Sequence, residues 1–506
     1  PQQRMMTCVP SLDEFGKAYA AGKPQIVHRT LVADLDTPVS AWLKLGVGDP
    51  HAFLLESVQG GEVRGRYSII GLKPDLIWRC RGGVAELRQR DGSPFVTEAG
   101  APLSSLRSLI ARVRVDIPHG LPPMTSGLFG YMGHDMVRLM ERLPEANPDP
   151  LGLPDAQLVR PTVVAIFDSV RANIVIATPC FPETGIDAAT AYERAEERLS
   201  AVAVDFSRNA SWPQMPAASG AALGAPESNT SHAEYLALVA RAKEYILAGD
   251  IFQVVPSQRF RRRFDLHPFQ LYRALRRLNP SPYLYFLNYP GFSVVGSSPE
   301  ILVRVRDGAV TIRPIAGTIR RGETPEEDRT LAETLLADPK ERAEHLMLLD
   351  LGRNDVGRVA VTGTVKVTEQ FVIEKYSHVQ HIVSNVQGQL RPDKDVLDAL
   401  IAGFPNGTTS GAPKIRALEI IDELEKEKRG IYGGAVGYFS AAGNMDMCIA
   451  LRTAIVKDGT MYVQAGGGVV ADSDPQAEYM ETVFKSKALF AAADEANRLA
   501  DGHQNR

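Results

Sequence analysis

Residues 340–355 read KERAEHLMLLDLGRND, and their pattern predicts a helix with carboxylates on one face. Residues three or four positions apart are neighbours on a helix, so Glu341, Glu344 and Leu348 would lie side by side. Further helices are predicted at 185–202, 231–248, 325–336, 413–426 and 475–500, and the quoted stretch belongs to one at 339–353. The helical part of the fold is therefore concentrated in the second half of the chain.

Short β-like runs accompany these helices in both halves of the chain. They cover residues 51–55, 67–70, 75–79, 163–167, 173–177, 253–255, 283–288, 292–296, 301–306 and 310–312. Neighbouring runs are joined by short turns such as Arg306-Asp-Gly308, which is typical of antiparallel hairpins. We expect an α+β fold in which helices pack outside antiparallel sheets.

One composition shift divides the chain. Residues 207–229 are rich in Ala, Ser, Pro, Gly and Asn and have little apolar periodicity, which indicates a linker. A chain of 506 residues is long for one hydrophobic core. We predict an N-terminal domain at 1–206 and a second domain at 230–506.

The overall composition excludes several classes of protein. A net charge of −4 argues against a general nucleic-acid binder, which needs clustered excess Lys and Arg. The basic run Arg259–Arg263 is interpreted as a strand edge, and Arg273, Arg276 and Arg277 as a solvated helix face. No apolar run is long enough for a membrane span. The four scattered cysteines show no metal or disulfide spacing, so a cytoplasmic location is expected.

A second carboxylate pair occurs in DSDPQAEYMET, residues 472–482, where Glu478 and Glu481 lie one turn apart at a helix start. With Glu344 they could hold Mg²⁺, which prefers carboxylate and water oxygens. The alternative is a solvated helix face or compensation of the helix dipole, and spacing alone favours it.

Glycine-rich segments and a histidine pair complete the pattern. YGGAVGY at 432–438 and QAGGGV at 464–469 match neither a Walker loop nor a dinucleotide fingerprint, and tight strand packing would also explain them. NGTTSGAPK at 406–414 leads into a helix, where backbone N–H groups favour anions. Only one of His378 and His381 is expected to face inward. These features suggest a Mg²⁺-dependent enzyme for a small anionic substrate.

Taken together, these segments resemble the chorismate-utilising enzymes over nearly the whole second part. The motifs that carry the resemblance, in order, are Ser298–Glu300, Pro314–Thr318, Glu344–Asp355, Gly407–Lys414, Tyr432–Gly434, Gln464–Gly468 and Glu478–Thr482. The resemblance implies that the antiparallel sheets pack as a sandwich, as in anthranilate and aminodeoxychorismate synthases.

The resemblance also implies site roles. Glu344 and Glu481 would hold Mg²⁺, with Glu478 close by through water. Catalytic roles fall to Glu300 as general acid, to His381 in the elimination of pyruvate, and to Thr408 beside the substrate. The chorismate pocket would be lined by Gly317, Thr318, Tyr432, Arg452, Gly466, Gly467 and Gly468, with Arg452 gripping the enolpyruvyl carboxylate.

Single positions separate the branches of this family. Relatives that aminate chorismate at C4 have lysine where this chain has Ala316, and isochorismate synthases have a water-activating lysine where it has Gln253. Both positions favour the anthranilate-forming branch. The alternatives are an aminodeoxychorismate synthase, an aminodeoxyisochorismate synthase, or an inactive tryptophan-binding regulator.

The first part resembles the tryptophan feedback site of the anthranilate-forming branch. The residues implied are Glu56, Ser57, Pro282, Tyr283 and Leu284. Leu284 replaces a common methionine and His134 a common tyrosine, which leaves the strength of inhibition open. No glutamine amidotransferase domain is visible, so we expect a separate amidotransferase subunit, a hetero-oligomer, and activity with free ammonia that improves at higher pH.

Overall fold

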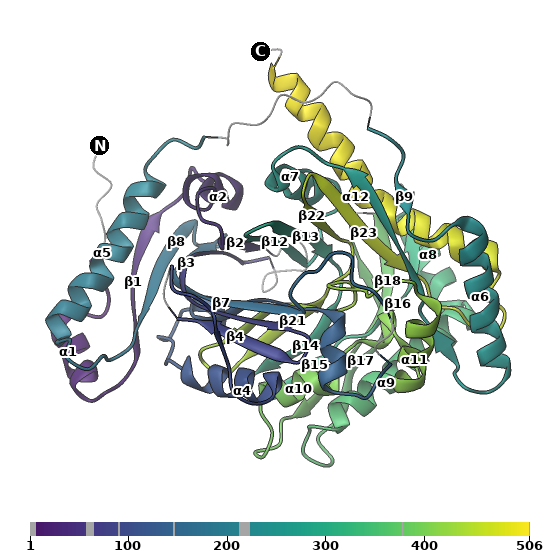
Figure 1. The fold of residues 1–506 in the computed structure, drawn as a ribbon, viewed down its shortest axis with the longest axis horizontal. Helices are drawn as coiled ribbons and strands as arrows, with labels where there is room; N and C mark the ends of the chain where they lie inside the picture. The colour runs from purple at the N-terminus through teal and green to yellow at the C-terminus, as the bar shows by residue number, and fades with distance from the viewer. Residues whose placement is uncertain are drawn as a thin grey trace.

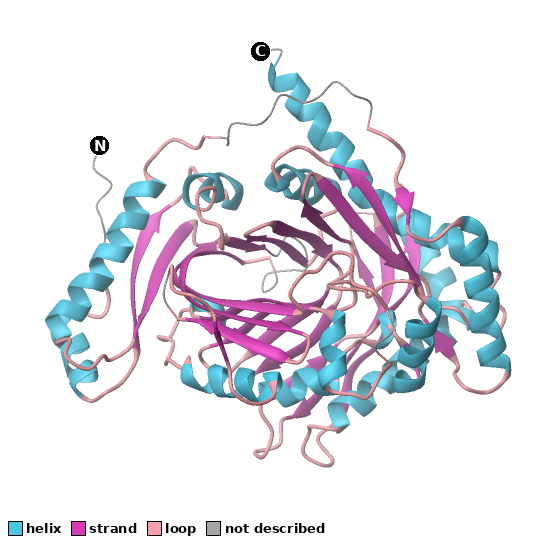
Figure 2. Cartoon of the chain, viewed as in Figure 1, coloured by secondary structure: helices cyan, strands magenta, loops and turns pink. Residues whose placement is uncertain are grey.

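The computed structural model describes residues 7–56, 65–89, 92–144, 147–211, 223–376 and 378–504. Antiparallel strands form its centre and helices surround them, as Figure 2 shows. This arrangement confirms the predicted α+β class.

The elements before the predicted linker are strand-rich. They are α1 (Leu12–Ala20), β1 (Gln25–Val32), α2 (Pro38–Leu45), β2 (Phe53–Glu56), β3 (Tyr67–Arg81), β4 (Val84–Arg88), β5 (Val96–Thr97), α4 (Pro102–Arg112), the 3₁₀ turn η1 (Pro123–Thr125), β6 (Gly127–Met132), the 3₁₀ turn η2 (His134–Leu139), β7 (Ala156–Asp168), β8 (Asn173–Cys180) and α5 (Ala188–Phe206).

The elements after it include the longest helix of the described residues, α12. They are β9 (Glu227–Ser228), α6 (His232–Leu247), β10 (Gln253–Val254), β11 (Ser257–Arg263), α7 (Pro268–Leu278), β12 (Tyr283–Tyr289), β13 (Phe292–Ser298), β14 (Ile301–Arg306), β15 (Ala309–Ile312), β16 (Ile315–Arg320), α8 (Pro325–Ala337), α9 (Pro339–Gly357), β17 (Lys366–Lys375), β18 (Val379–Gln389), α10 (Val396–Ala402), the 3₁₀ turn η3 (Gly407–Thr409), β19 (Gly411–Ala412), α11 (Lys414–Leu424), β20 (Ala435–Ser440), β21 (Met445–Ile449), β22 (Thr453–Lys457), β23 (Thr460–Gly466) and α12 (Pro475–Gln504).

Local sequence signals explain where the helices begin. The Ser231 side chain accepts a hydrogen bond from the Glu234 backbone N–H, and the Glu234 side chain accepts one from the Ser231 backbone N–H. The predicted capping box therefore precedes α6. Asp338 caps α9, and Pro339 occupies the first turn, where a missing N–H costs nothing. The helix predicted from residues 340–355 is therefore confirmed.

Alternating strand residues fill different hydrophobic cores. On β2, Phe53 belongs to a core between two layers of strands, whereas Leu54 belongs to a core under α1, α2, α5, α7 and α12. A third core lies under α4, α6, α9, α10 and α11 and contains Trp78 and Leu128. Because successive side chains of a strand point to opposite faces, one strand serves two cores. The result is a sandwich with helices on both outer faces, seen along the top and bottom of Figure 1.

Strands from both parts of the chain interleave in this sandwich. β2 pairs with β12, so that Leu284 lies opposite Glu56, and β6 pairs with β20, so that Met132 lies opposite Ala435. Both pairings cross the predicted boundary at 207–229, of which residues 212–222 lie outside the described ranges. Where the chain divides into folding units stays a prediction.

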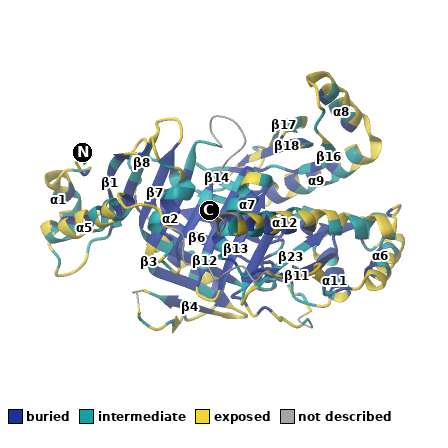
Figure 3. Cartoon of the chain, turned by 90° about the horizontal axis from the view of Figure 1, so that it is seen from above, coloured by how far each residue is buried: buried dark blue, intermediate teal, exposed yellow. Residues whose placement is uncertain are grey.

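The prediction that the basic run Arg259–Arg263 lies at a strand edge is wrong for two of its residues, which are buried. Arg259 and Arg262 on β11 are buried, and they pair with Glu427 at 3.1 Å and Asp494 at 2.7 Å. In Figure 3 exposed residues gather instead at the outer helices, α1, α5, α6 and α8 among them. No helix in the described ranges is long and apolar enough to cross a membrane. All four cysteines are buried with free thiols.

Candidate active site and effector pocket

Glu300 is a buried carboxyl at the turn between β13 and β14. Its side chain accepts a hydrogen bond from the Thr408 hydroxyl at 3.2 Å. Burial raises the pKa of Glu300 to about 8, although bonds from Thr408 and the Ile315 backbone favour the ionised form. A carboxyl that keeps its proton at neutral pH can act as a general acid.

The backbone around Glu300 is fixed by neighbouring strands. The Ser298 hydroxyl donates to the Ile449 carbonyl at 2.6 Å, and the Ile449 N–H donates to the Glu300 carbonyl at 2.9 Å. These bonds join the end of β13 to the end of β21, which leads directly to Arg452. The Ser297 N–H also donates to the Arg452 carbonyl at 3.1 Å, so one hydrogen-bond network holds the backbones of Glu300 and Arg452.

His381 and Thr318 face each other across paired strands. β16 and β18 place them opposite one another, and Thr318 Oγ1 lies 2.9 Å from His381 Nδ1. Burial, with the nearby charge of Arg452, lowers the pKa of His381 to about 4. His381 is therefore neutral at physiological pH and can accept a proton, whereas His378 is exposed.

Arg452 is the positive group of this cluster. It adopts a left-handed backbone conformation, with φ of 45°, in the turn between β21 and β22. Within the described residues it forms no ion pair, and burial lowers its pKa. A partly desolvated guanidinium with free donors is suited to a carboxylate ligand. Gly317, with φ of 87°, lies beside His381 and hydrogen-bonds to it.

Gly466, the last residue of β23, and the two glycines that follow it lie tightly against neighbouring side chains. A Cβ on Gly467 would lie 3.2 Å from oxygens of both Glu478 and Glu481, and one on Gly468 would lie 2.1 Å from the Gln253 amide nitrogen. A Cβ on Gly466 would lie 2.8 Å from the Tyr432 hydroxyl. The glycine run thus lies between the predicted metal-binding glutamates and Tyr432, a predicted substrate-binding residue. Burial raises the pKa of Tyr432 to about 12, so its hydroxyl stays protonated.

The predicted metal ligands approach from two helices. Glu344 on α9 has its pKa raised by burial and then by repulsion from Glu341 and Glu481. Burial and repulsion from Glu481 also raise the pKa of Glu478 on α12. Lys485 partly offsets this negative charge, since its Nζ lies 2.9 Å from Glu481.

These carboxylates are close enough to repel one another, but within the described residues they are not arranged as a set of metal ligands. In the described part of the chain, no three His, Cys, Asp or Glu side chains are arranged to hold a metal ion. The buried Oε2 of Glu478 nevertheless has no hydrogen-bond partner there. An unpartnered oxygen among mutually repelling carboxylates fits the donor chemistry that Mg²⁺ prefers.

Two buried ion pairs were not anticipated from the sequence. Asp355, from the 340–355 stretch, lies 3.5 Å from Lys414, from the 406–414 stretch, and both are buried. Each residue was part of a quoted motif, but spacing does not reveal the partner.

The second pair is Glu425 and Arg429. Arg429 donates to Glu425 at 2.8 Å and to the Val255 carbonyl at 2.6 Å, while Glu425 accepts from the Ser257 backbone and hydroxyl at 2.9 Å. Arg429 also donates to the Thr409 carbonyl at 2.5 Å, so this network anchors the loop that carries Thr408 and the segment before Tyr432. Its i,i+4 spacing is also typical of a solvated helix pair, so burial of this pair cannot be predicted from the sequence.

The two branch-deciding residues lie at the site. Ala316 is buried in β16, and its carbonyl lies 3.3 Å from the His345 ring nitrogen. Gln253 is buried in β10, and its Oε1 has no hydrogen-bond partner among the described residues. Neither side chain carries a charge.

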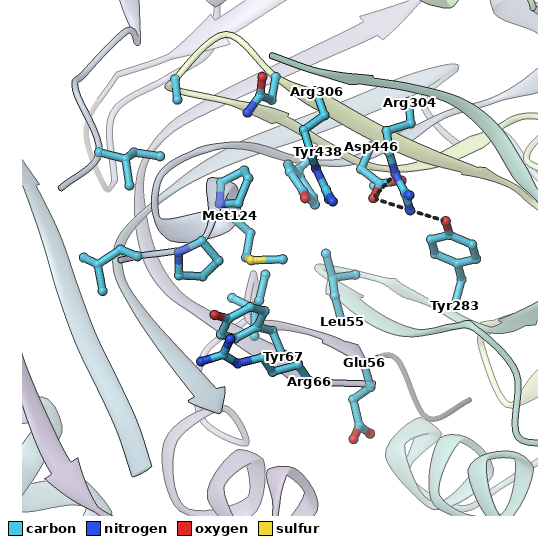
Figure 4. A pocket seen from close by; sticks show the side chains of 18 of the residues that line it. Leu55, Glu56, Arg66, Tyr67, Met124, Tyr283, Arg304, Arg306, Tyr438 and Asp446 are labelled. Carbon is cyan, nitrogen blue, oxygen red and sulfur yellow. Dashed lines mark hydrogen bonds and ion pairs between the residues drawn. The ribbon is translucent and has the colours of Figure 1, made fainter. Parts of the chain in front are cut away.

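A separate cavity of about 700 Å³ lies between the two strand layers. Glu56, Pro282, Tyr283 and Leu284 line it, which brings together four of the five residues predicted for feedback. Ser57 lies outside the described residues. Figure 4 shows Met124 and Leu55 in the apolar middle of the cavity, with Arg304 and Arg306 on one wall. His134 is buried elsewhere and does not line it.

The cavity is close to the active site through strand pairing. Cys448 of its lining lies opposite Ile301, which follows Glu300, and Tyr283 lies opposite Ser298. A ligand in the cavity would therefore contact the strands that hold Glu300.

Glu56 is held by helix α7. It accepts hydrogen bonds from the Tyr272 hydroxyl and from Arg276 Nε at 2.8 Å and Nη2 at 3.1 Å. Its side chain is 1% exposed, so these bonds fix a buried negative charge at the cavity wall.

Comparison with known proteins agrees with this geometry. Residues 51–491 match the family model described as chorismate binding enzyme. The chain is 57% identical over 493 residues to anthranilate synthase component 1 of Cereibacter sphaeroides, covering 97% of this chain and 98% of that relative. It is 51% identical over 489 residues to anthranilate synthase component 1 of Pseudomonas aeruginosa, covering 95% and 98%.

Solved structures give the same result. Anthranilate synthase component I of Streptococcus pneumoniae superposes with a TM-score of 0.74 at 37% identity, covering 85% of this chain and 94% of that one. The menaquinone-specific isochorismate synthase of Escherichia coli has a TM-score of 0.70 at 17% identity, covering 95% and 98%, and supports the fold alone. The chain therefore belongs to the chorismate-binding enzymes.

Proposed function

We propose that this chain is the chorismate-converting component of an anthranilate synthase, forming anthranilate and pyruvate from chorismate and ammonia. The observation that carries the proposal is the buried, protonated Glu300 beside Thr408. The relatives named anthranilate synthase component 1, at 46–57% identity over nearly the full chain, support the same reaction.

In the first step Glu300 donates a proton to the C4 hydroxyl of chorismate, which leaves as water. Ammonia adds at C2 as the ring double bonds shift, giving aminodeoxyisochorismate. The uncharged side chains of Ala316 and Gln253 support this choice, since neither provides a lysine amine to attack C4 or to activate water at C2.

In the second step the C2 proton is lost and the C3–oxygen bond breaks, and the departing enolpyruvate takes up a proton at its methylene carbon to become pyruvate. His381 is the candidate to accept the C2 proton, because it is neutral at physiological pH and lies beside Thr318 in the pocket. Thr318 orients the imidazole ring of His381 through its contact with Nδ1, and Arg452 binds the enolpyruvyl carboxylate. The sum is chorismate plus ammonia giving anthranilate, pyruvate and water.

Substrate binding would involve Mg²⁺ held by Glu344 and Glu481, with Glu478 nearby. When bound, the ion would neutralise the carboxylate cluster and accept the ring carboxylate of chorismate. Gly317, Thr318, Tyr432 and Gly466 to Gly468 would line the pocket around that ring. The raised pKa values of Glu344 and Glu478 support a cation here, because the carboxylates repel one another without one.

Two further parts of the function concern partners. A separate glutamine amidotransferase subunit would supply ammonia in a hetero-oligomer, as the words component 1 in the relatives' names suggest. L-Tryptophan would bind the 700 Å³ cavity as a feedback inhibitor, a role supported by the convergence of Glu56, Pro282, Tyr283 and Leu284. A cytoplasmic location fits a biosynthetic enzyme of this type.

The test is an assay of the purified chain with chorismate, Mg²⁺ and ammonium, with products separated by chromatography. The proposal requires anthranilate, and it requires a chelator to abolish turnover. Aminodeoxychorismate would contradict the role of Ala316, and accumulated aminodeoxyisochorismate would contradict that of His381. Mg²⁺-dependent chorismate binding without any product would identify an inactive regulator.

A further inference from the structure

The arginines that line the effector cavity differ in whether a carboxylate of the protein already pairs with them. Arg66 forms an ion pair with Asp168, because its Nε and Nη2 donate to that carboxylate at 3.0 and 2.7 Å. Arg171 lies 3.9 Å from the same carboxylate and has a 64% exposed side chain. Neither arginine therefore offers a desolvated positive charge to a ligand.

A third arginine, Arg304, is neutralised on β14. Its guanidinium donates to Asp446 at 3.2 Å and to the Tyr283 hydroxyl at 2.9 Å. The proximity of Asp446 raises the pKa of Arg304, as expected for a tight ion pair. This charge is already satisfied within the wall.

Arg306 is different from these three. It stands two residues after Arg304 on β14 and so projects from the same face toward the cavity that it lines. It is half-buried, and among the described residues it has no ion pair. Figure 4 shows its guanidinium beside Tyr438, reaching toward the cavity. Its donors are therefore available to an anionic ligand.

The strand on the facing wall, β2, presents an apolar side chain to the cavity. Leu55 lies in the middle of the cavity, whereas the Glu56 carboxylate points away from it toward Tyr272 and Arg276 of α7, as Figure 4 shows. An apolar cavity with a guanidinium that has no ion pair among the described residues suits an anionic ligand with an apolar side chain.

We propose that Arg306 binds the α-carboxylate of the tryptophan that occupies this cavity and thereby selects an amino acid over an amine. This inference rests on the feedback function proposed above. The guanidinium presents paired N–H donors whose geometry matches a carboxylate, and partial burial strengthens the contact. The indole would lie against Leu55, Met124 and Tyr438.

Calorimetry on the full chain tests the role of Arg306 with three ligands: L-tryptophan, tryptamine, which lacks the carboxylate, and indole-3-propionate, which lacks the ammonium group. In the unmodified protein, tryptophan should bind about 10- to 100-fold more tightly than tryptamine, the range for a charge-assisted hydrogen bond. Arg306→Gln should lower tryptophan and indole-3-propionate affinity by about the same factor and leave tryptamine affinity unchanged. The tryptophan affinity of Arg306→Lys should lie between that of the unmodified protein and that of Arg306→Gln.

Arg171→Gln is the matched control, since it removes another arginine of the cavity lining. It should keep the preference for tryptophan over tryptamine. The role of Arg306 is overturned if Arg306→Gln keeps that preference, or if it loses tryptophan and tryptamine binding equally. Absence of tryptophan binding to the unmodified chain would instead overturn the feedback function itself, and this inference with it.

Discussion

Thr408 donates a hydrogen bond to Glu300 across 3.2 Å, although 108 residues separate the two in sequence. The bond stabilises the carboxylate form, but burial outweighs it and holds the pKa of Glu300 at about 8. The pair thus combines an acid that is protonated at neutral pH with a donor that can stabilise it after proton transfer.

Glu300→Gln should abolish most of the ammonia-driven turnover while leaving the fold intact. The amide fills the same volume but cannot deliver a proton, and loss of a general acid costs about 100- to 10,000-fold. The measurement is the steady-state rate of anthranilate formation. A variant within a few-fold of the unmodified chain would exclude Glu300 as the acid.

The stability of this variant provides its control. The folded state holds the Glu300 proton up to pH of about 8, whereas the unfolded chain releases it near 4.5. Stability from this group is therefore lost as pH rises through that window. Glutamine does not ionise, so the melting temperature of Glu300→Gln relative to the unmodified chain should increase from about pH 6 to about pH 9. A melting temperature that is lower by the same amount at every pH would show a general loss of stability that does not come from ionisation of Glu300.

The pH–rate profile should report Glu300 directly. At a fixed concentration of free NH₃, kcat/KM for chorismate should fall as pH rises through about 8, because the proton donor ionises. Thr408→Val removes a bond that favours the ionised form, so the falling limb should move to higher pH. Movement to lower pH, or a flat profile in the unmodified chain, would contradict this assignment.

Replacement of the proposed metal ligands should weaken magnesium activation specifically. Glu344→Gln and Glu481→Gln should each raise the Mg²⁺ concentration for half-maximal activity by about 10-fold or more, because each removes a charged oxygen donor. Asp472→Asn is the control, since that side chain is 73% exposed and lies just before α12. Equal effects of all three variants would indicate general loss of negative charge rather than coordination.

Helix α7 should control the strength of feedback. Tyr272→Phe and Arg276→Gln each remove a donor that fixes Glu56, so both should raise the tryptophan concentration needed for half inhibition, by about 5- to 20-fold. Arg277→Gln is the matched control, because that neighbouring arginine pairs with Glu495 instead. Inhibition that is unchanged in Tyr272→Phe and Arg276→Gln would separate Glu56 from the effector.

Much of the fold follows from local sequence signals. The helix predicted at 339–353 is α9 at Pro339–Gly357, and the run 301–306 is β14 with the same bounds. Capping residues, proline positions and alternating apolar residues act within a few positions of one another. Such features can therefore be predicted from a single sequence.

Long-range pairings could not be predicted in this way. Arg259 is part of a basic run that is typical of a solvated surface, yet it is buried against Glu427 from far along the chain. The ion pairs of Asp355 with Lys414 and of Glu56 with Arg276 could not be predicted for the same reason. The charge of a residue is visible in the sequence, but the partner that compensates it is fixed only when distant strands and helices pack. The residues of the candidate site could be predicted because their motifs resemble those of the chorismate-utilising enzymes.

The most direct test of the proposed reaction is a mass balance on the purified chain. With chorismate limiting and Mg²⁺ and ammonia in excess, anthranilate and pyruvate should each equal the chorismate consumed, with no amino-substituted cyclohexadiene remaining. A stable aminated intermediate in place of equimolar anthranilate and pyruvate would contradict the assignment of both chemical steps to this site.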